Sequence, residues 1–74
     1  MMTLGDRVYT ALTGRAVDGD ERDLLVLQVR GLDPKLGDEL RRWLGVAPVD
    51  AWTANIFRAA VSGIEIRERR EEAR

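Results

Sequence analysis

The chain lacks cysteine and histidine altogether, and no apolar run in it approaches the roughly 18 residues that span a membrane. Without cysteine it forms no disulfide, and without both residues it lacks the usual zinc ligands and the usual general base of an enzyme. The N-terminus does not show the basic and then apolar pattern of a signal peptide. We therefore expect a cytoplasmic, non-enzymatic protein with no cofactor and no metal.

The two signs of charge are nearly balanced, since 12 basic residues stand against 13 acidic ones and the net charge is −1. Nucleic-acid-binding modules are usually more basic than this. Every basic residue except Lys35 is arginine, which we interpret as the bias of a GC-rich bacterial or bacteriophage genome. An acidic cluster within 18–23 lacks the spacing of a calcium loop, so we interpret it as a turn leading into a helix.

A chain of 74 residues forms one domain and buries only about 60% of the surface that its unfolded form exposes. Small domains compensate with disulfides, metals or association. Because this chain has neither cysteine nor histidine, association is the remaining route. We therefore expect the protein to self-associate as a homodimer or to bind another protein, with a helical monomer of unusually good packing as the alternative.

Glycines and capping residues divide the chain into four segments. Four glycines are placed to end a helix: Gly14, Gly31, Gly45 and Gly63. Three residues are placed to cap the start of a helix: Thr3, Asp33 and Asp50. The clearest helix covers 34–44 and has Pro34 at its first position, although Gly37 weakens it by about 1 kcal/mol relative to alanine.

Residues 24–30 are ambiguous and follow a polar segment, 15–23, that we interpret as a loop or turn. Asp20 could cap a helix that includes 24–30, whereas a strand there could pair with 64–67. We therefore predict a mainly α fold, a small bundle of three to four short helices, with an α+β fold containing a two-stranded sheet as the alternative. Residues 1–64 would form the domain and residues 65–74 a charged tail, helical or frayed.

The segment 24–30 and the helix that begins at 51 carry more apolar side chains than one buried face needs, which indicates a protein partner. For 24–30 the alternative is that the other helices of the domain cover both faces. The predicted interface residues are Leu24, Val26, Val29, Trp52, Ile56 and Ala60. Trp43 and Trp52 both fall on apolar helix faces beside the turn at 45–48. We expect both tryptophans to pack in the core, with an exposed aromatic anchor as the alternative.

Residues 36–62 resemble a helix-turn-helix motif. Leu40, Leu44, Gly45 and Val46 match its apolar and glycine positions, whereas Arg41 stands where such motifs usually have alanine. The resemblance implies that the second helix enters the major groove of DNA. It also implies a set of DNA contacts: Arg41, Arg42, Thr53, Asn55 and Arg58.

Two functions follow from these observations. The first is a small non-enzymatic interaction module, regulatory in role, that self-associates or docks on a protein partner. The second is a helix-turn-helix transcriptional regulator, for which nucleic acid would be the partner. Neither a membrane nor a small-molecule substrate is expected.

Overall fold

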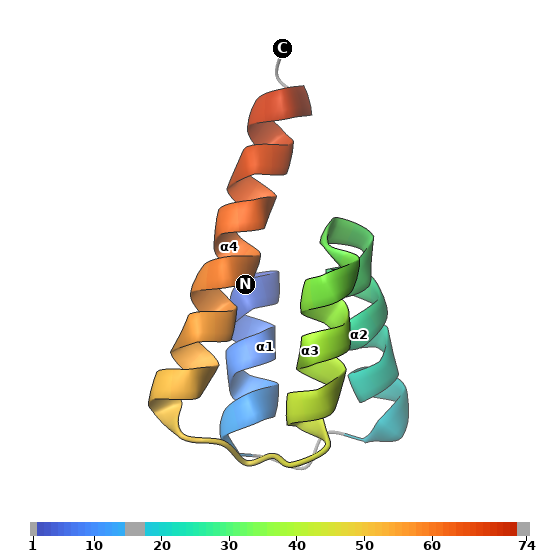
Figure 1. Ribbon diagram of the computed structural model, residues 1–74, viewed down its shortest axis with the longest axis vertical. Helices are drawn as coiled ribbons and strands as arrows, with labels where there is room; N and C mark the ends of the chain where they lie inside the picture. The colour runs from blue at the N-terminus through green and yellow to red at the C-terminus, as the bar shows by residue number, and fades with distance from the viewer. Residues whose placement is uncertain (1, 15–17, 73–74) are drawn as a thin grey trace.

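The computed structural model of the chain describes residues 2–14 and 18–72, with side chains through Arg70, and the regular structure of these residues is entirely helical. The four helices are α1 (Leu4–Thr13), α2 (Gly19–Leu32), α3 (Pro34–Leu44) and α4 (Ala51–Glu72). Each helix runs antiparallel to the next along the long axis of the molecule (Figure 1). The prediction of a mainly α bundle is confirmed. The alternative with a sheet is wrong, because 24–30 and 64–67 are both helical.

Each helix begins at a side-chain oxygen that accepts a hydrogen bond from an N–H group of the first turn, where the helix offers no backbone partner. The three predicted caps are confirmed, with distances of 3.0–3.1 Å to the nearest amide: Thr3, Asp33 and Asp50. The cap of α2 is Asp18, which accepts from the N–H of Glu21 at 2.9 Å, so the prediction of Asp20 is wrong. The loop predicted at 15–23 is also wrong over 18–23, while 15–17 lie outside the described residues.

Two of the four glycines predicted to end a helix do so. Gly14 and Gly45 follow α1 and α3 directly, whereas Gly31 and Gly63 lie inside α2 and α4. α2 ends only at Asp33, since the residue before Pro34 disfavours the helical conformation. α4 continues through Gly63 because strong helix formers follow it. The predicted tail is therefore, over 65–72, the second half of one helix, and 73–74 lie outside the described residues.

The bundle consists of two helix pairs, because α1 packs mainly along α4 and α2 packs mainly along α3. A glycine lies in the contact of each pair. A Cβ atom at Gly37 of α3 would lie 2.9 Å from the Cα atom of Arg30, which is too short for a real Cβ atom. A Cβ atom at Gly5 of α1 would lie 2.6 Å from the Oγ atom of Ser62 and 3.0 Å from the carbonyl oxygen of Arg58, so the serine side chain would have to move. Gly5 and Gly37 therefore let the helices of each pair approach closely.

All four helices contribute to one hydrophobic core, in which the described residues bury no polar or charged side chain. Its members are Val8, Ala11, Leu12, Leu25, Val26, Val29, Leu40, Leu44, Ala54, Phe57 and Val61. The N–H of Val49 donates a hydrogen bond to the carbonyl oxygen of Leu12 at 2.7 Å, which holds the start of α4 beside the end of α1. From there α4 rises along the bundle, and its C-terminal half extends beyond the other helices (Figure 1). No helix in the described part of the chain is long and apolar enough to cross a membrane.

The variant Gly37→Ala tests the close approach of α2 and α3. Helix propensity alone would make alanine more stable by about 1 kcal/mol. The new Cβ atom would instead collide with the backbone of Arg30, and overpacking of this kind costs about 1–3 kcal/mol. We expect a net loss of about 1 kcal/mol, measured by urea unfolding followed by circular dichroism.

Gly31→Ala is the matched control, because Gly31 also lies in a helix but has open space around it. This variant should unfold at the same urea concentration as the parent chain or at a higher one. If Gly37→Ala were as stable as Gly31→Ala, the described packing of α2 on α3 would be incorrect.

Candidate interaction surface

Helix α4 carries apolar side chains on two opposite faces. Its inner face places Ala54, Phe57 and Val61 in the core. Its other face carries a second row, here called the outer stripe: Trp52, Ile56, Ala59, Gly63 and Ile66. At about 3.6 residues per turn, the spacing of four, three, four and three residues keeps these positions within one narrow arc, on the side opposite Val61.

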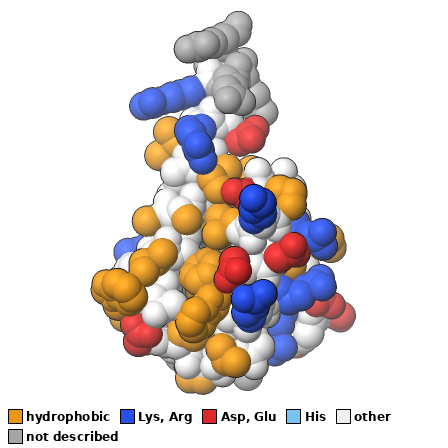
Figure 2. Space-filling view, viewed as in Figure 1, with side chains coloured by type: hydrophobic (Ala, Val, Ile, Leu, Met, Phe, Trp, Pro, Cys, Tyr) orange, Lys and Arg blue, Asp and Glu red, His pale blue; other side chains and the backbone are white. Residues whose placement is uncertain are grey.

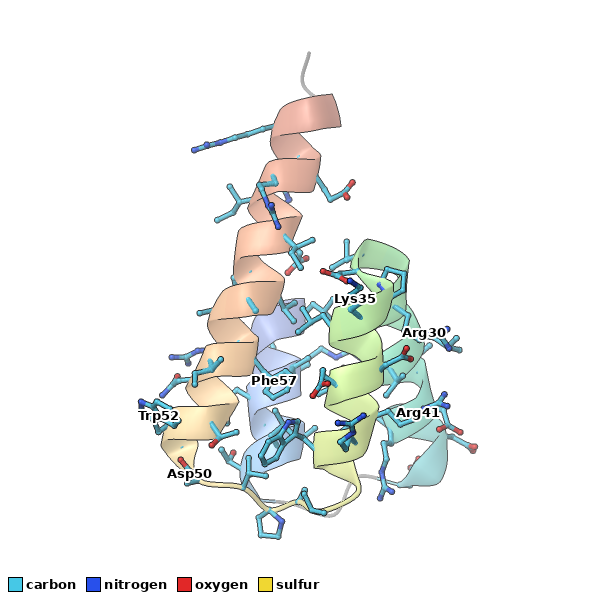
Figure 3. The ribbon with its side chains drawn as sticks, viewed as in Figure 1. Arg30, Lys35, Arg41, Asp50, Trp52 and Phe57 are labelled. Carbon is cyan, nitrogen blue, oxygen red and sulfur yellow. The ribbon has the colours of Figure 1, made fainter. Side chains whose placement is uncertain are left out.

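The large side chains of the outer stripe are exposed to solvent. Trp52 is 74% exposed, Ile56 50% and Ile66 52%. Trp52 points away from the other helices, whereas Phe57 points from α4 toward the inside of the bundle (Figure 3). Figure 2 shows hydrophobic side chains gathered along α4 and across the face between α4 and α3. The outer stripe is therefore an apolar surface that the bundle itself leaves uncovered.

The two tryptophans differ, although the sequence predicted the same core position for both. Trp43 of α3 is 37% exposed, and its ring meets the ring of Phe57 edge-on, with 6.4 Å between the ring centroids. It therefore lies at the edge of the core. Trp52 contributes nothing to the core, so the prediction is wrong for this residue, and the alternative of an exposed aromatic side chain describes it.

The residues predicted for the protein interface separate into three groups. Trp52 and Ile56 lie in the outer stripe, and Ala60 is half-buried beside it. Val26 and Val29 are fully buried in the core, so assigning them to an exposed surface was wrong: the helical period turns them inward. Leu24 is half-exposed on α2, on the other side of the bundle from α4 (Figure 1).

Leu27 and Ile66 are among the exposed apolar residues that were missed from the sequence. Leu27 lies one turn from Leu24 on the exposed face of α2, a relation that exists only if 24–30 is helical. Ile66 completes the outer stripe, but it follows Gly63, where a helix end was predicted. In both cases the signal is a spacing of three or four residues from another residue of the same face. This spacing has meaning only when 24–30 is helical and when α4 continues past Gly63.

The residues that the helix-turn-helix resemblance assigns to DNA do not form one surface. Arg58 reaches α1, where its guanidinium carbon lies 4.8 Å from the ring centroid of Tyr9 and a nitrogen lies 4.0 Å from a carboxylate oxygen of Asp6. The Thr53 hydroxyl donates a hydrogen bond to the Asp50 carboxylate at 2.7 Å. The other three assigned residues are exposed: Arg41, Arg42 and Asn55.

The connection between α3 and α4 also departs from that motif. A helix-turn-helix joins its helices at about 90–120° through a turn of three or four residues. Here residues 45–50 connect α3 to α4, and the two helices run in opposite directions (Figure 1). DNA binding therefore stays a prediction, second to the apolar surface on α4.

The charged residues differ between the two ends of the outer stripe. At its N-terminal end, hydrogen bonds from the side chain and then the backbone N–H of Thr53 hold the pKa of Asp50 below its usual value of 3.8. Asp50 is thus an anion at neutral pH. At the C-terminal end, three arginines and one glutamate are exposed: Arg67, Glu68, Arg69 and Arg70. The charges at the ends of the apolar row can therefore favour one orientation of a bound helix over the other.

A hollow of about 220 Å³ lies where α4 passes the corner between α2 and α3. It is lined by Leu32, Asp33, Ile64, Arg67 and Glu68. Small-molecule sites usually have volumes of about 300–1,000 Å³ and enclose their ligand. This hollow is smaller than that, so the outer stripe is the better candidate for the functional surface.

Comparison of the chain with protein-family models, with curated proteins and with solved structures finds no match.

The variant Arg58→Ala tests whether this arginine joins α1 to α4. It removes the cation over Tyr9 and the ion pair with Asp6, both of which are partly exposed. We expect a loss of about 0.5–1 kcal/mol in urea unfolding, mostly from the aromatic contact. Arg42→Ala is the control, because Arg42 is exposed on α3 and pairs only with Glu39 in the same helix. Equal stability of the two variants would show that Arg58 contributes nothing to the α1–α4 pair.

Proposed function

We propose that this chain is a small, non-enzymatic interaction module, regulatory in role, that binds a helix of another protein molecule through the outer stripe of α4. The observation that carries this function is the 74% exposure of Trp52 at the start of an aligned apolar row. Tryptophan is enriched among the residues that dominate binding energy at protein interfaces. Docked helices are typically held by anchors three or four residues apart, which is the spacing here.

The residues of the outer stripe are not needed to complete the core. The inner face of α4 already supplies Ala54, Phe57 and Val61 to a core that all four helices complete. Single apolar side chains scattered over a surface are normal in monomeric proteins. Three large ones in register on the face of α4 opposite the core are different, because no helix of the bundle can reach them.

The chemistry of the chain favours the same function. It has no cysteine or histidine for nucleophilic or metal-assisted catalysis, and the outer stripe contains no titratable group. Because the chain is also free of disulfides, we place the module in the cytoplasm, where thiols are kept reduced and such staples are rare. There the outer stripe would be covered by its binding partner.

Site-specific photo-crosslinking in cells that make the protein tests this function. A photoreactive residue would replace Trp52 in one variant and Glu39, exposed on α3, in the other. We expect a discrete adduct from position 52, because this side chain would be covered by the partner. We also expect a weaker adduct from position 52 when Ile56→Asp is added, because the anion disrupts the apolar contact.

Circular dichroism of each variant checks that the bundle is folded. Equal adducts from positions 52 and 39, or none from either, would contradict the proposed function.

A further inference from the structure

Building on the proposed function, we infer that the outer stripe binds the outer stripe of a second copy of this chain, with the two α4 helices antiparallel. A two-fold axis between the levels of Ala59 and Gly63 would place one stripe upon the other. Three observations support this pairing: the spacing of the stripe, the order of its side chains, and the charges at its ends.

The spacing indicates that the occupant is a helix lying along α4. Positions 52, 56, 59, 63 and 66 follow the alternation of four and three residues that defines the contact seam of a coiled coil. Arg70 continues the same alternation. Within the described chain, α2 exposes a shorter apolar row, Leu24 and Leu27, whereas the row on α4 has five positions and the C-terminal half of α4 stands clear of the bundle (Figure 1).

The order of side chains is complementary to itself when it is reversed. With the axis at its centre, Ala59 faces Gly63 of the second copy, and these two small residues let the helix backbones come close. On either side, Ile56 faces Ile66 of the second copy. A row with small residues at its centre and an isoleucine on either side fits a two-fold dimer, in which one patch serves both partners.

The charges select the antiparallel direction. Trp52 faces Arg70 of the second copy, and an arginine over a tryptophan ring is a favourable cation–π pair. The Asp50 carboxylate, held ionised by Thr53, lies at the same end as Trp52. A parallel pairing would instead place Arg70 opposite Arg70 of the second copy. The antiparallel dimer therefore has a Trp52–Arg70 pair at each end and avoids this repulsion.

The bundle leaves room for this partner. α1 packs on α4 from the side of the inner face, near Gly5 and Arg58, and Trp52 points the opposite way (Figure 3). From Trp52 to Arg70 the seam is about 27 Å long, given a rise of about 1.5 Å per residue. A seam of this length falls at the small end of specific interfaces, so we expect a reversible dimer rather than a permanent one.

Sedimentation velocity of the full chain, from about 1 μM to about 1 mM, tests the dimer over the range of weak interfaces. We expect the weight-average mass to rise from the monomer toward the dimer. Ile56→Asp should weaken association at least about tenfold, because it places a charge opposite Ile66 of the second copy. The matched control is Leu27→Asp, an exposed apolar residue of α2, which should dimerise like the parent chain. A monomer at every concentration, or equal loss in both variants, would overturn the inference.

The direction of pairing can be read from disulfides, since the chain has no cysteine of its own. Asn55→Cys and Arg69→Cys lie on one flank of the stripe and leave its apolar residues intact. In the antiparallel dimer these two positions face each other across the two copies, within reach of a disulfide. Oxidising an equimolar mixture should therefore give mostly the mixed dimer. Parallel pairing would instead keep positions 55 and 69 about 21 Å apart along the helix axis, given a rise of about 1.5 Å per residue. A mixture without an excess of the mixed dimer would therefore overturn the antiparallel dimer.

These results separate the inference from the function on which it rests. If position 52 crosslinks to a different protein while the pure chain stays monomeric, the outer stripe binds a partner but the dimer is excluded. If a dimer forms that Leu27→Asp disrupts and Ile56→Asp does not, the outer stripe is not the contact surface and both proposals fail.

Discussion

Three short helices can cover only one face of α4, and the arrangement of the molecule follows from this limit. α1 packs against the inner face of α4 through the close approach at Gly5, and α2 with α3 closes the core from the other side. The opposite face of α4 has apolar residues of its own and no helix left to cover them. In the proposed dimer, the second molecule covers these residues.

The core and the outer stripe have different roles. The core is free of buried polar side chains among the described residues, and all four helices of a single copy contribute to it. The outer stripe can then act as a binding surface whose geometry is already set by a rigid helix. Such preorganisation lowers the entropic cost of association, which matters for an interface as small as one helix seam.

Local chemistry made the helix starts predictable. Thr3, Asp33 and Asp50 were identified as caps because a hydroxyl or carboxylate can satisfy the free N–H groups of a first turn, and this interaction spans only three residues. The helix ends were less predictable. Gly31 and Gly63 resemble helix stops in sequence, yet neither adopts a positive φ, and both lie within continuous helices. A glycine permits a helix to end but does not require it.

The amino-acid sequence by itself determined the helical class, three of the four helix starts and the apolar surplus that suggested a partner. The tertiary structure decided which apolar residues make up that surplus. Val26 and Val29 were as apolar as Trp52 and Ile56 in sequence, but packing buried the first two and left the others in solvent. The reason is that burial depends on which face of a helix meets its neighbours. Which faces meet depends on contacts between different helices, such as Gly5 with Arg58 and Gly37 with Arg30. The local sequence pattern of one helix does not specify these contacts.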